Sequence, residues 1–457
     1  MRWIEGLCLT GLLHTLPAAA QDPLPTPTTL RYDEDWSVLA ASGIAAHDPL
    51  DAIKYTPLTD DGAIYLVIGA ELRSRYEGYA NNLTSEETGL DDGYLWVRSL
   101  PYADLHVGRA RFFAQPIAAY AFGVKPEAGP VDRTGLDLLQ GFAEVGMGAE
   151  DRFVIRAGRQ LVSLGSERLV GTRYGPNVPR AFDGVRFDAS YGIGKLSVLW
   201  AQPVAPGPHD FDDRANKTRS IWAAYATLNL SAGKADIYYI GTRNDAAVWN
   251  SAQGEEKRQT FGLRTFATRG NWRWNVEAIG QIGQIGEDRV RAWSIASNVS
   301  RTFPKAPLTP TIDAKFNIAS GDRSRDDSTL GTFDALYPKG QYFGELTPIG
   351  PYNMINAHLG ANLQPLPDLA IGVAASDYWR HRRADGIYSV PGGLLRSGDL
   401  GTARHVGSQL ELTMDWQPTR HVEVSASAST FWPGRFLNET GFSRNIDMIA
   451  IEVTHKF

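Results

Sequence analysis

Residues 445–457, NIDMIAIEVTHKF, carry the clearest pattern in the chain. Apolar and polar side chains alternate there with a period of two. One face carries Ile449, Ile451, Val453 and Phe457, and the other carries Met448, Ala450, Glu452, Thr454 and Lys456. A period of two is that of a β-strand. The stretch therefore predicts a strand with one apolar face and one mixed face, which ends on the last residue.

Two architectures contain such a strand. The final strands of outer-membrane β-barrels resemble it, because they alternate lipid-facing and lumen-facing residues and usually end on a Phe that the assembly machinery reads. The alternative is an ordinary strand of a soluble sandwich that happens to end on Phe457. The composition of the chain and its connections separate the two.

The composition favours a barrel. The 457 residues are 21% charged and include 46 Gly, and the mean hydropathy is slightly negative, which no helical membrane protein would show. The net charge of −6 argues against a partner made of nucleic acid. The only cysteine is Cys8, so an exported mature chain would need a closed ladder of hydrogen bonds rather than disulfides.

Three segments follow from the pattern. Residues 1–20 predict a secretory signal peptide, with an apolar run over 6–16 and small residues at 18–20 before the cleavage site. Residues 21–61 predict an irregular periplasmic segment, because Pro23, Pro25 and Pro27 forbid a regular strand. Residues 62–457 predict the barrel, since the period becomes two from Ala63 onward.

The connections give the strongest argument. We count about eighteen strands joined by alternating short and long connections, as in an up-and-down barrel with periplasmic turns and extracellular loops. The turns are placed at 108, 150, 192–193, 231–232, 269–270, 303–306, 366–367 and 417–418, and the loops at 80–92, 123–137, 161–180, 204–217, 244–256, 321–349, 383–402 and 433–443. Only 285–287 breaks the alternation. The prediction is an all-β, monomeric, antiparallel transmembrane barrel in the outer membrane.

The parity of each strand also assigns a lumen face. Assigning the apolar parity to lipid leaves these candidate pore-lining residues: Glu71, Arg73, Arg75, Arg98, Arg109, Arg111, Asp188, Arg186, Arg264, Arg273, Arg380, Arg382 and Glu411. Arginine outnumbers the acids on this face, and arginines that line a water-filled pore favour anions. The alternative for any one arginine is a structural ion pair in the wall.

A set of motifs carries a family resemblance. Arg156-Ala-Gly-Arg-Gln160, Gly165-Ser-Glu-Arg-Leu169 and Ala181-Phe-Asp-Gly-Val-Arg186 resemble the central signature of the alginate export family of outer-membrane barrels. Blocks around 48–54, 69–76, 319–322 and 332–344 are similar as well. The resemblance implies an eighteen-stranded barrel with a basic lumen that passes an anionic polysaccharide. It marks Gly158, Arg159, Gln160, Phe182, Asp183 and Gly184 as motif residues and implies that Arg159 lines the pore.

Parity conflicts with that assignment. Arg156 and Arg159 fall on opposite faces of a regular strand, as do Asp183 and Arg186. We therefore expect a β-bulge or a rim position here, because a bare charge facing lipid costs about 2–4 kcal/mol at the midplane. Founding members of the family also gate with a periplasmic turn. All such turns are short here, which leaves residues 21–61 as the candidate plug.

The predicted function is passive, anion-selective diffusion of an acidic polysaccharide or oligosaccharide, or of small organic anions. The expected partners are outer-membrane lipid, the anionic solute and the barrel-assembly machinery through Phe457. We expect no cofactor, no metal and no enzymatic activity, because the chain lacks a Gly-x-Ser-x-Gly elbow and its histidines are scattered. The alternatives are an occluded structural or receptor-like barrel, or an outer-membrane hydrolase.

Overall fold

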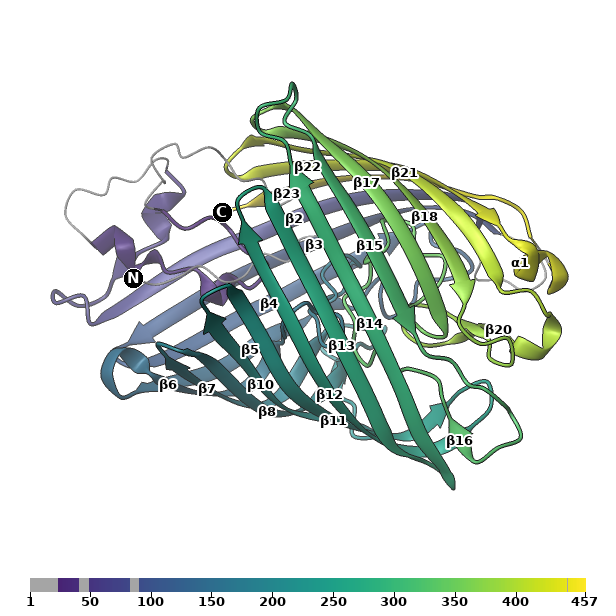
Figure 1. Ribbon diagram of the computed structural model, residues 1–457. Helices are drawn as coiled ribbons and strands as arrows, with labels where there is room; N and C mark the ends of the chain where they lie inside the picture. Colours follow the sequence, from purple (N-terminus) through teal and green to yellow (C-terminus); the bar gives the residue numbers. More distant parts are fainter. Residues whose placement is uncertain (1–23, 41–48, 83–89, 442) are drawn as a thin grey trace.

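The structure is a computed structural model that describes residues 24–40, 49–82, 90–441 and 443–457. The signal peptide predicted over residues 1–20 lies outside the described residues. Eighteen long strands form one closed antiparallel barrel (Figure 1). Among the helices of the described part, none has the length and apolar character that a membrane crossing requires.

The long strands follow one another around the barrel in chain order. They are β2 (Ile64–Asn82), β3 (Leu90–Val107), β4 (Ala110–Phe122), β5 (Gly135–Met147), β6 (Phe153–Leu161), β7 (Ala181–Tyr191), β8 (Gly194–Ala205), β10 (Arg219–Leu230), β11 (Gly233–Val248), β12 (Gln253–Arg269), β13 (Trp272–Ile285), β14 (Asp288–Thr302), β15 (Thr311–Ala319), β17 (Met354–Leu366), β18 (Leu369–Arg380), β21 (His405–Thr419), β22 (Val422–Pro433) and β23 (Ile446–Lys456). The predicted number of strands is confirmed.

The first and last long strands close the barrel. β23 pairs with β2 from Glu71↔Lys456 to Ala80↔Asp447, and the backbones of Ala70 and Phe457 exchange two hydrogen bonds of 3.0 Å. Closure leaves no free sheet edge, which is what a sheet surrounded by lipid requires. The two faces of β23 are as predicted, because Ile449, Ile451 and Val453 are exposed on the outer face.

Short elements occupy the connections and the N-terminal part. They are η1 (Arg31–Asp33), η2 (Trp36–Ala40), η3 (Asp51–Ile53), β1 (Thr56–Pro57), η4 (Ala149–Asp151), β9 (Arg214–Ala215), β16 (Thr329–Leu330), β19 (Ile387–Tyr388), β20 (Leu394–Arg396), η5 (Gly398–Leu400) and α1 (Arg435–Glu439). We call the end of the barrel with the short turns and the C-terminus the terminal end, and the opposite end the loop end. The described residues that precede β2 lie at the terminal end (Figure 1).

Connection lengths alternate as predicted, with one correction. The expected long loop over 244–256 does not form, because β11 and β12 extend to Val248 and from Gln253 and leave only residues 249–252 between them. The residues at these strand ends lack the apolar period, yet they continue the β11–β12 pairing as far as Val248↔Gln253, beyond the part of the wall whose outer face is apolar. The exception expected near 285–287 is a tight turn at 286–287.

Two of the loops fold inward. Residues 162–180 and 331–353, which we call the first and second roof loops, cross the barrel interior and pack on its inner wall. Val170 and Tyr337 form an isolated bridge between them, with Tyr337 N–H donating to Leu169 O at 2.8 Å and Gly171 N–H to Tyr337 O at 3.0 Å. Apolar residues of both roof loops are buried against wall residues such as Phe182 and Ile221.

The described N-terminal residues 24–40, which we call the N-terminal segment, also lie inside the barrel. Leu24, Tyr32 and Trp36 are buried with inward-facing side chains of β2 to β5, among them Phe113 and Phe142. The ring of Tyr32 meets those two rings edge-on, at centroid distances of 5.9 and 5.4 Å. Aromatic burial of this kind holds an irregular segment without a strand ladder.

Candidate functional site

A water-accessible cavity of about 1200 Å³ occupies the terminal half of the barrel. Its lining includes Thr29, Tyr32 and Asp33 of the N-terminal segment on one side, and the turn residues Gly270 and Asn271 on another. The roof loops bound it toward the loop end, where residues 163–168, 341–342 and 344–345 face it. The cavity is therefore a vestibule at the terminal end, with the roof loops as its inner boundary.

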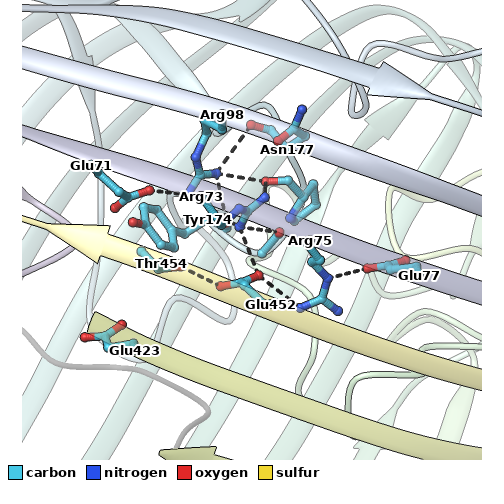
Figure 2. Close-up of polar contacts among 12 residues, drawn as sticks. Glu71, Arg73, Arg75, Glu77, Arg98, Tyr174, Asn177, Glu423, Glu452 and Thr454 are labelled. Atoms are coloured by element: carbon cyan, nitrogen blue, oxygen red, sulfur yellow. Dashed lines mark hydrogen bonds and ion pairs between the residues drawn. The ribbon is translucent and has the colours of Figure 1, made fainter. Parts of the chain in front are cut away.

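Two arginines, Arg73 of β2 and Arg98 of β3, hold the first roof loop, and Arg75 of β2 lies beside them (Figure 2). Arg73 donates to the backbone carbonyls of Tyr174 at 3.0 Å, Gly175 at 2.8 Å and Pro176 at 2.9 Å. Arg98 donates to Tyr174 O at 3.2 Å and Pro176 O at 3.1 Å, and its guanidinium lies 4.4 Å from the centre of the Tyr174 ring. We call Arg73, Arg75 and Arg98 the arginine cluster.

The cluster also carries ion pairs. Arg98 pairs with Glu71 at 2.7 Å, and both side chains are almost fully buried. Arg75 reaches Glu345 of the second roof loop at 2.8 Å and Glu452 of β23 at 3.2 Å. Buried arginines of this kind need partners, because an unpaired buried charge is strongly unfavourable. The cluster therefore ties both roof loops to the wall at β2, β3 and β23.

Glu411 of β21 anchors the second roof loop from the far side of β23. Its carboxylate accepts hydrogen bonds from the backbone N–H of Glu345 at 2.7 Å and of Leu346 at 3.4 Å, and from the hydroxyl of Ser429 at 2.9 Å. It is thus a loop anchor that also lines the cavity. Its role as a loop anchor has no local signal in the sequence, because its partners are distant backbone groups.

The charges that line the cavity are nearly balanced. The basic residues are Arg73, Arg75, Arg156, Arg168, Arg186, Arg264, Arg273, Lys195, Lys234, Lys315, Lys339 and Lys456, and the acidic ones are Asp33, Glu167, Asp188, Asp236, Asp313, Glu345, Glu411, Asp415, Glu423 and Glu452. The predicted excess of arginine over acids is thus absent from the cavity. Lysines, which the sequence-based list omitted, supply the remaining positive charge. Lys315 has the same parity as Asp313 and Asn317 on β15, and this shared parity was a usable signal that Lys315 points inward.

The structure places the predicted pore residues in three groups. Arg73, Arg75, Arg186, Arg264, Arg273, Asp188 and Glu411 line the cavity. Glu71, Arg98 and Arg111 point inward but are covered by their partners, and Arg111 pairs with Asp104 and donates to Tyr32 O at 2.6 Å. The remaining residues lie elsewhere.

Arg109, Arg380 and Arg382 do not line the cavity. Arg109 is exposed in the turn between β3 and β4, where the strand parity no longer applies. Arg380 ends β18 and donates to carbonyls of the following connection, including Ala403 O at 2.6 Å and Gly401 O at 2.8 Å. Arg382 lies in that same connection, and its backbone N–H donates to the side-chain oxygen of Asn353 at 2.7 Å. These two arginines shape the loop end.

Arg159 lies on the opposite face from the cavity, contrary to the expectation drawn from the family. It faces Asp183 across the β6–β7 ladder and binds that carboxylate at 2.8 and 3.1 Å, while Arg156 on the inner face lines the cavity. The ladder from Phe153 to Leu161 has no register shift, so no bulge forms. The position is instead near the end of the strand, where the two opposite charges neutralise each other.

The other motif residues have packing roles. Gly158 has a φ of 131°, and a Cβ there would lie 2.3 Å from Gly141 O. Gly184 faces Gly158 across the ladder, and a Cβ there would lie 2.2 Å from Trp200 O. The glycines thus allow close approach of neighbouring strands, while Phe182 and Gln160 are buried.

One group of acids is arranged closely enough to bind a metal. Ligand atoms of Asp137, Asp212 and Asp213 lie within 4.8 Å of one another at the loop end. Protein donors already serve this group, since Arg159 lies 3.6 Å from Asp137 and the hydroxyl of Thr134 donates to Asp213 at 2.6 Å. We assign no metal to it.

Solved structures share this fold at low sequence identity. OccAB3 of Acinetobacter baumannii is 11% identical with a TM-score of 0.59, over 85% of this chain and 99% of that one. OccK2 (OpdF) of Pseudomonas aeruginosa, solved with glucuronate, is 11% identical with a TM-score of 0.57, over 88% and 98%. OpdK of the same organism, solved with vanillate, is 10% identical with a TM-score of 0.57, over 85% and 98%.

A search of proteins with curated functions found no match. The sequence profile described as alginate export matches residues 64–449, which run from the first residue of β2 into β23. This match covers most of the chain and agrees with the closed eighteen-stranded barrel. The chain therefore belongs to the alginate export family, and it is a porin-like β-barrel of the outer membrane.

Proposed function

We propose that the protein is a passive channel that admits acidic saccharides, or small organic anions of similar chemistry, from its periplasmic side. In barrels of this class the short turns face the periplasm, so the terminal end and its vestibule are periplasmic. The observation that carries the proposal is the vestibule itself, whose lining offers many basic side chains among nearly as many acidic ones, in a chain of the alginate export family.

The lining suits a hydroxylated solute that carries carboxylates. Amide and hydroxyl side chains, among them Asn275, Asn298 and Ser300, lie between the charged residues and offer hydrogen bonds to sugar hydroxyls. Arginine and lysine offer charge-assisted bonds to carboxylates. A volume of about 1200 Å³ exceeds the roughly 300–1,000 Å³ of pockets for drug-sized ligands, so several sugar residues fit.

The near balance of charges limits the expected selectivity. Several of the basic residues pair with carboxylates, among them Arg75, Arg186 and Arg264, so the field in the vestibule is a set of local dipoles rather than a uniform positive potential. We expect a modest preference for anions. The glucuronate and vanillate in the two Pseudomonas aeruginosa structures are carboxylates, which agrees with a barrel of this fold serving such solutes.

The test is the reversal potential of the purified protein in a planar bilayer under a salt gradient. Lys195 lines the vestibule with a side chain 47% exposed, so Lys195→Glu should shift the reversal potential toward cations. Lys257, whose side chain is 61% exposed and does not line the vestibule, gives the matched control Lys257→Glu. Equal reversal potentials for the two variants would contradict the proposal. Block by oligogalacturonate or oligomannuronate would identify the solute class.

A second candidate function is an occluded structural or receptor-like barrel. The observation that favours it is the packing of the roof loops, whose buried residues Leu346 and Ile349 lie in one apolar cluster with Phe431 and Phe436. Such packing resists opening. A wild-type protein that stays silent in the bilayer while it assembles normally would favour this second function.

A further inference from the structure

The N-terminal segment places a carboxylate in the anion path. Asp33 lies at the end of η1 and is exposed to the vestibule, which Arg156, Arg186 and Lys195 also line. Arg156 lies close to Asp33, because its guanidinium is 4.1 Å from the centre of the ring of Tyr32, the preceding residue, and Arg186 faces Arg156 across the β6–β7 ladder. Burial raises the pKa of the Asp33 carboxyl, and the positive charges of Arg156, Lys195, Arg186 and Arg111 oppose this shift. No ion pair joins Asp33 directly to any of them among the described residues.

The position of Asp33 is fixed by its neighbours. Before it in the chain, Arg31 donates to Phe457 O at 2.9 Å, and Tyr32 donates from its hydroxyl to Leu161 O at 3.1 Å and accepts from Arg111 at 2.6 Å through its carbonyl oxygen. After it, the Glu34 carboxylate pairs with Arg31 at 2.6 Å and accepts from the hydroxyl of Tyr102 on β3 at 3.5 Å. Residues on both sides of Asp33 are thus held to the barrel wall. Its carboxylate stands at the floor of the vestibule as a resident charge.

The local charges explain why this carboxylate matters. Arg156 is paired with Glu144 at 2.6 Å and Arg186 with Asp188 at 2.9 Å, while Lys195 lies 3.7 Å from that same Asp188. Three cations therefore face two wall carboxylates, which leaves one positive charge. Asp33 offsets this charge in place of a solute carboxylate.

We propose that Asp33 is a specificity-determining residue that competes with the solute carboxylate for Arg156, Arg186 and Lys195. A channel needs binding that is favourable enough for entry and weak enough for release. A resident competitor lowers the affinity of the basic group for anions and so keeps a multiply charged chain from being retained. This inference rests on the proposed function, because it takes an acidic saccharide as the solute.

The experiment is equilibrium binding of trigalacturonate to the purified full-length barrel, with uncharged maltotriose as the comparison ligand. Asp33→Asn should tighten trigalacturonate binding roughly three- to tenfold at low salt, as expected when one like charge is removed several ångströms away in a water-filled space. Maltotriose binding should not change, and added salt should reduce the gain.

The matched control is Asp35→Asn, which removes the same charge two residues along. Asp35 accepts a hydrogen bond from the backbone N–H of Ser37 at 3.2 Å and does not line the vestibule. Asp33→Ser repeats the charge removal with a smaller side chain, and heat-modified mobility on a gel reports whether each barrel is assembled. Tighter trigalacturonate binding in both Asp33 variants, with Asp35→Asn unchanged, supports the proposal.

Unchanged or weaker binding in assembled Asp33 variants would overturn the proposal, as would equal effects of Asp33→Asn and Asp35→Asn. Binding is measured without current, so this result is independent of conduction. A barrel that binds more tightly after Asp33→Asn but shows no anion current would keep the inference and reject the channel function. A barrel that carries anion current but whose trigalacturonate binding does not change after Asp33→Asn would keep the channel function and reject the inference.

Discussion

Replacing Arg73 by Met should open the roof of the vestibule. Arg73 is 2% exposed and holds the first roof loop by three hydrogen bonds to backbone carbonyls, at 2.8 to 3.0 Å. The nearest carboxylate, that of Glu452, is 3.7 Å away, so the loop is its main partner. Arg73→Met therefore removes loop contacts without leaving a closely paired acid behind.

The magnitude follows from those three bonds. A hydrogen bond to a charged group contributes about 1.5–3 kcal/mol, but neighbouring bonds do not add fully and water replaces part of the loss. We take about 3 kcal/mol as the net loss, which is roughly a hundredfold shift toward the undocked loop. The shift toward the undocked loop in Arg73→Lys should lie between that of the wild type and that of Arg73→Met, because one ammonium cannot bind all three carbonyls.

The assay is single-channel recording of open probability in a planar bilayer. The control is Arg264→Met, which removes another vestibule arginine whose partners are Asp236 at 2.8 Å and Asn275 at 2.8 Å rather than a roof loop. We expect frequent openings for Arg73→Met and few for Arg264→Met. Equal open probabilities in the two variants would refute the assignment of Arg73 as a loop latch.

Three further predictions concern other parts of the barrel. Arg159→Ala should leave ion selectivity unchanged, because Arg159 lies outside the vestibule, but should lower the melting temperature by leaving Asp183 unpaired; a shift in reversal potential would contradict this placement. Lys54 packs on the N-terminal segment, with its Nζ 5.0 Å from the centre of the Trp36 ring. Burial and then the charge of Arg31 lower the pKa of Lys54 to about 7. Since the side chain has a pKa near 10.4 when the segment is undocked, the equilibrium constant for docking should rise by up to about tenfold per pH unit between pH 7 and 10. Hydrogen exchange of residues 24–40, corrected for intrinsic rates, measures this, and Lys54→Met should make the profile flat. Deletion of Phe457 removes the backbone pair with Ala70 that closes the barrel and should reduce assembly in the outer membrane, so a normal yield of heat-modifiable barrel would count against that role.

The barrel wall was predictable because its signals are local. The parity of side chains in 445–457 determines which face meets lipid, and that face is the exposed one in β23. The alternation of short and long connections gave the strand count. It failed at 244–256, where polar residues extend β11 and β12 beyond the apolar belt and so give no periodic signal.

Parity also separated Arg156 from Arg159, whereas the resemblance to the family assigned the wrong one of the two to the lumen. The structure agrees with the strict period, because the β6–β7 ladder is regular through both residues. A motif reports residue types at fixed spacings, and its Gly158 and Gly184 allow close packing of neighbouring strands here. It does not report which face of the strand a side chain occupies.

The sequence by itself therefore determined the barrel, its strand count, its lipid face and the inward direction of most charged residues, because each of these depends on neighbours two residues apart. Only the tertiary structure decided what the inward charges do. Arg73 binds carbonyls of a loop about a hundred residues away, and Arg98 binds carbonyls about eighty residues away. Asp33 lines the same cavity as Arg156, Arg186 and Lys195 on β6 to β8. Such partners meet only after the barrel closes and the loops and N-terminal segment fold into it, so no local pattern encodes them.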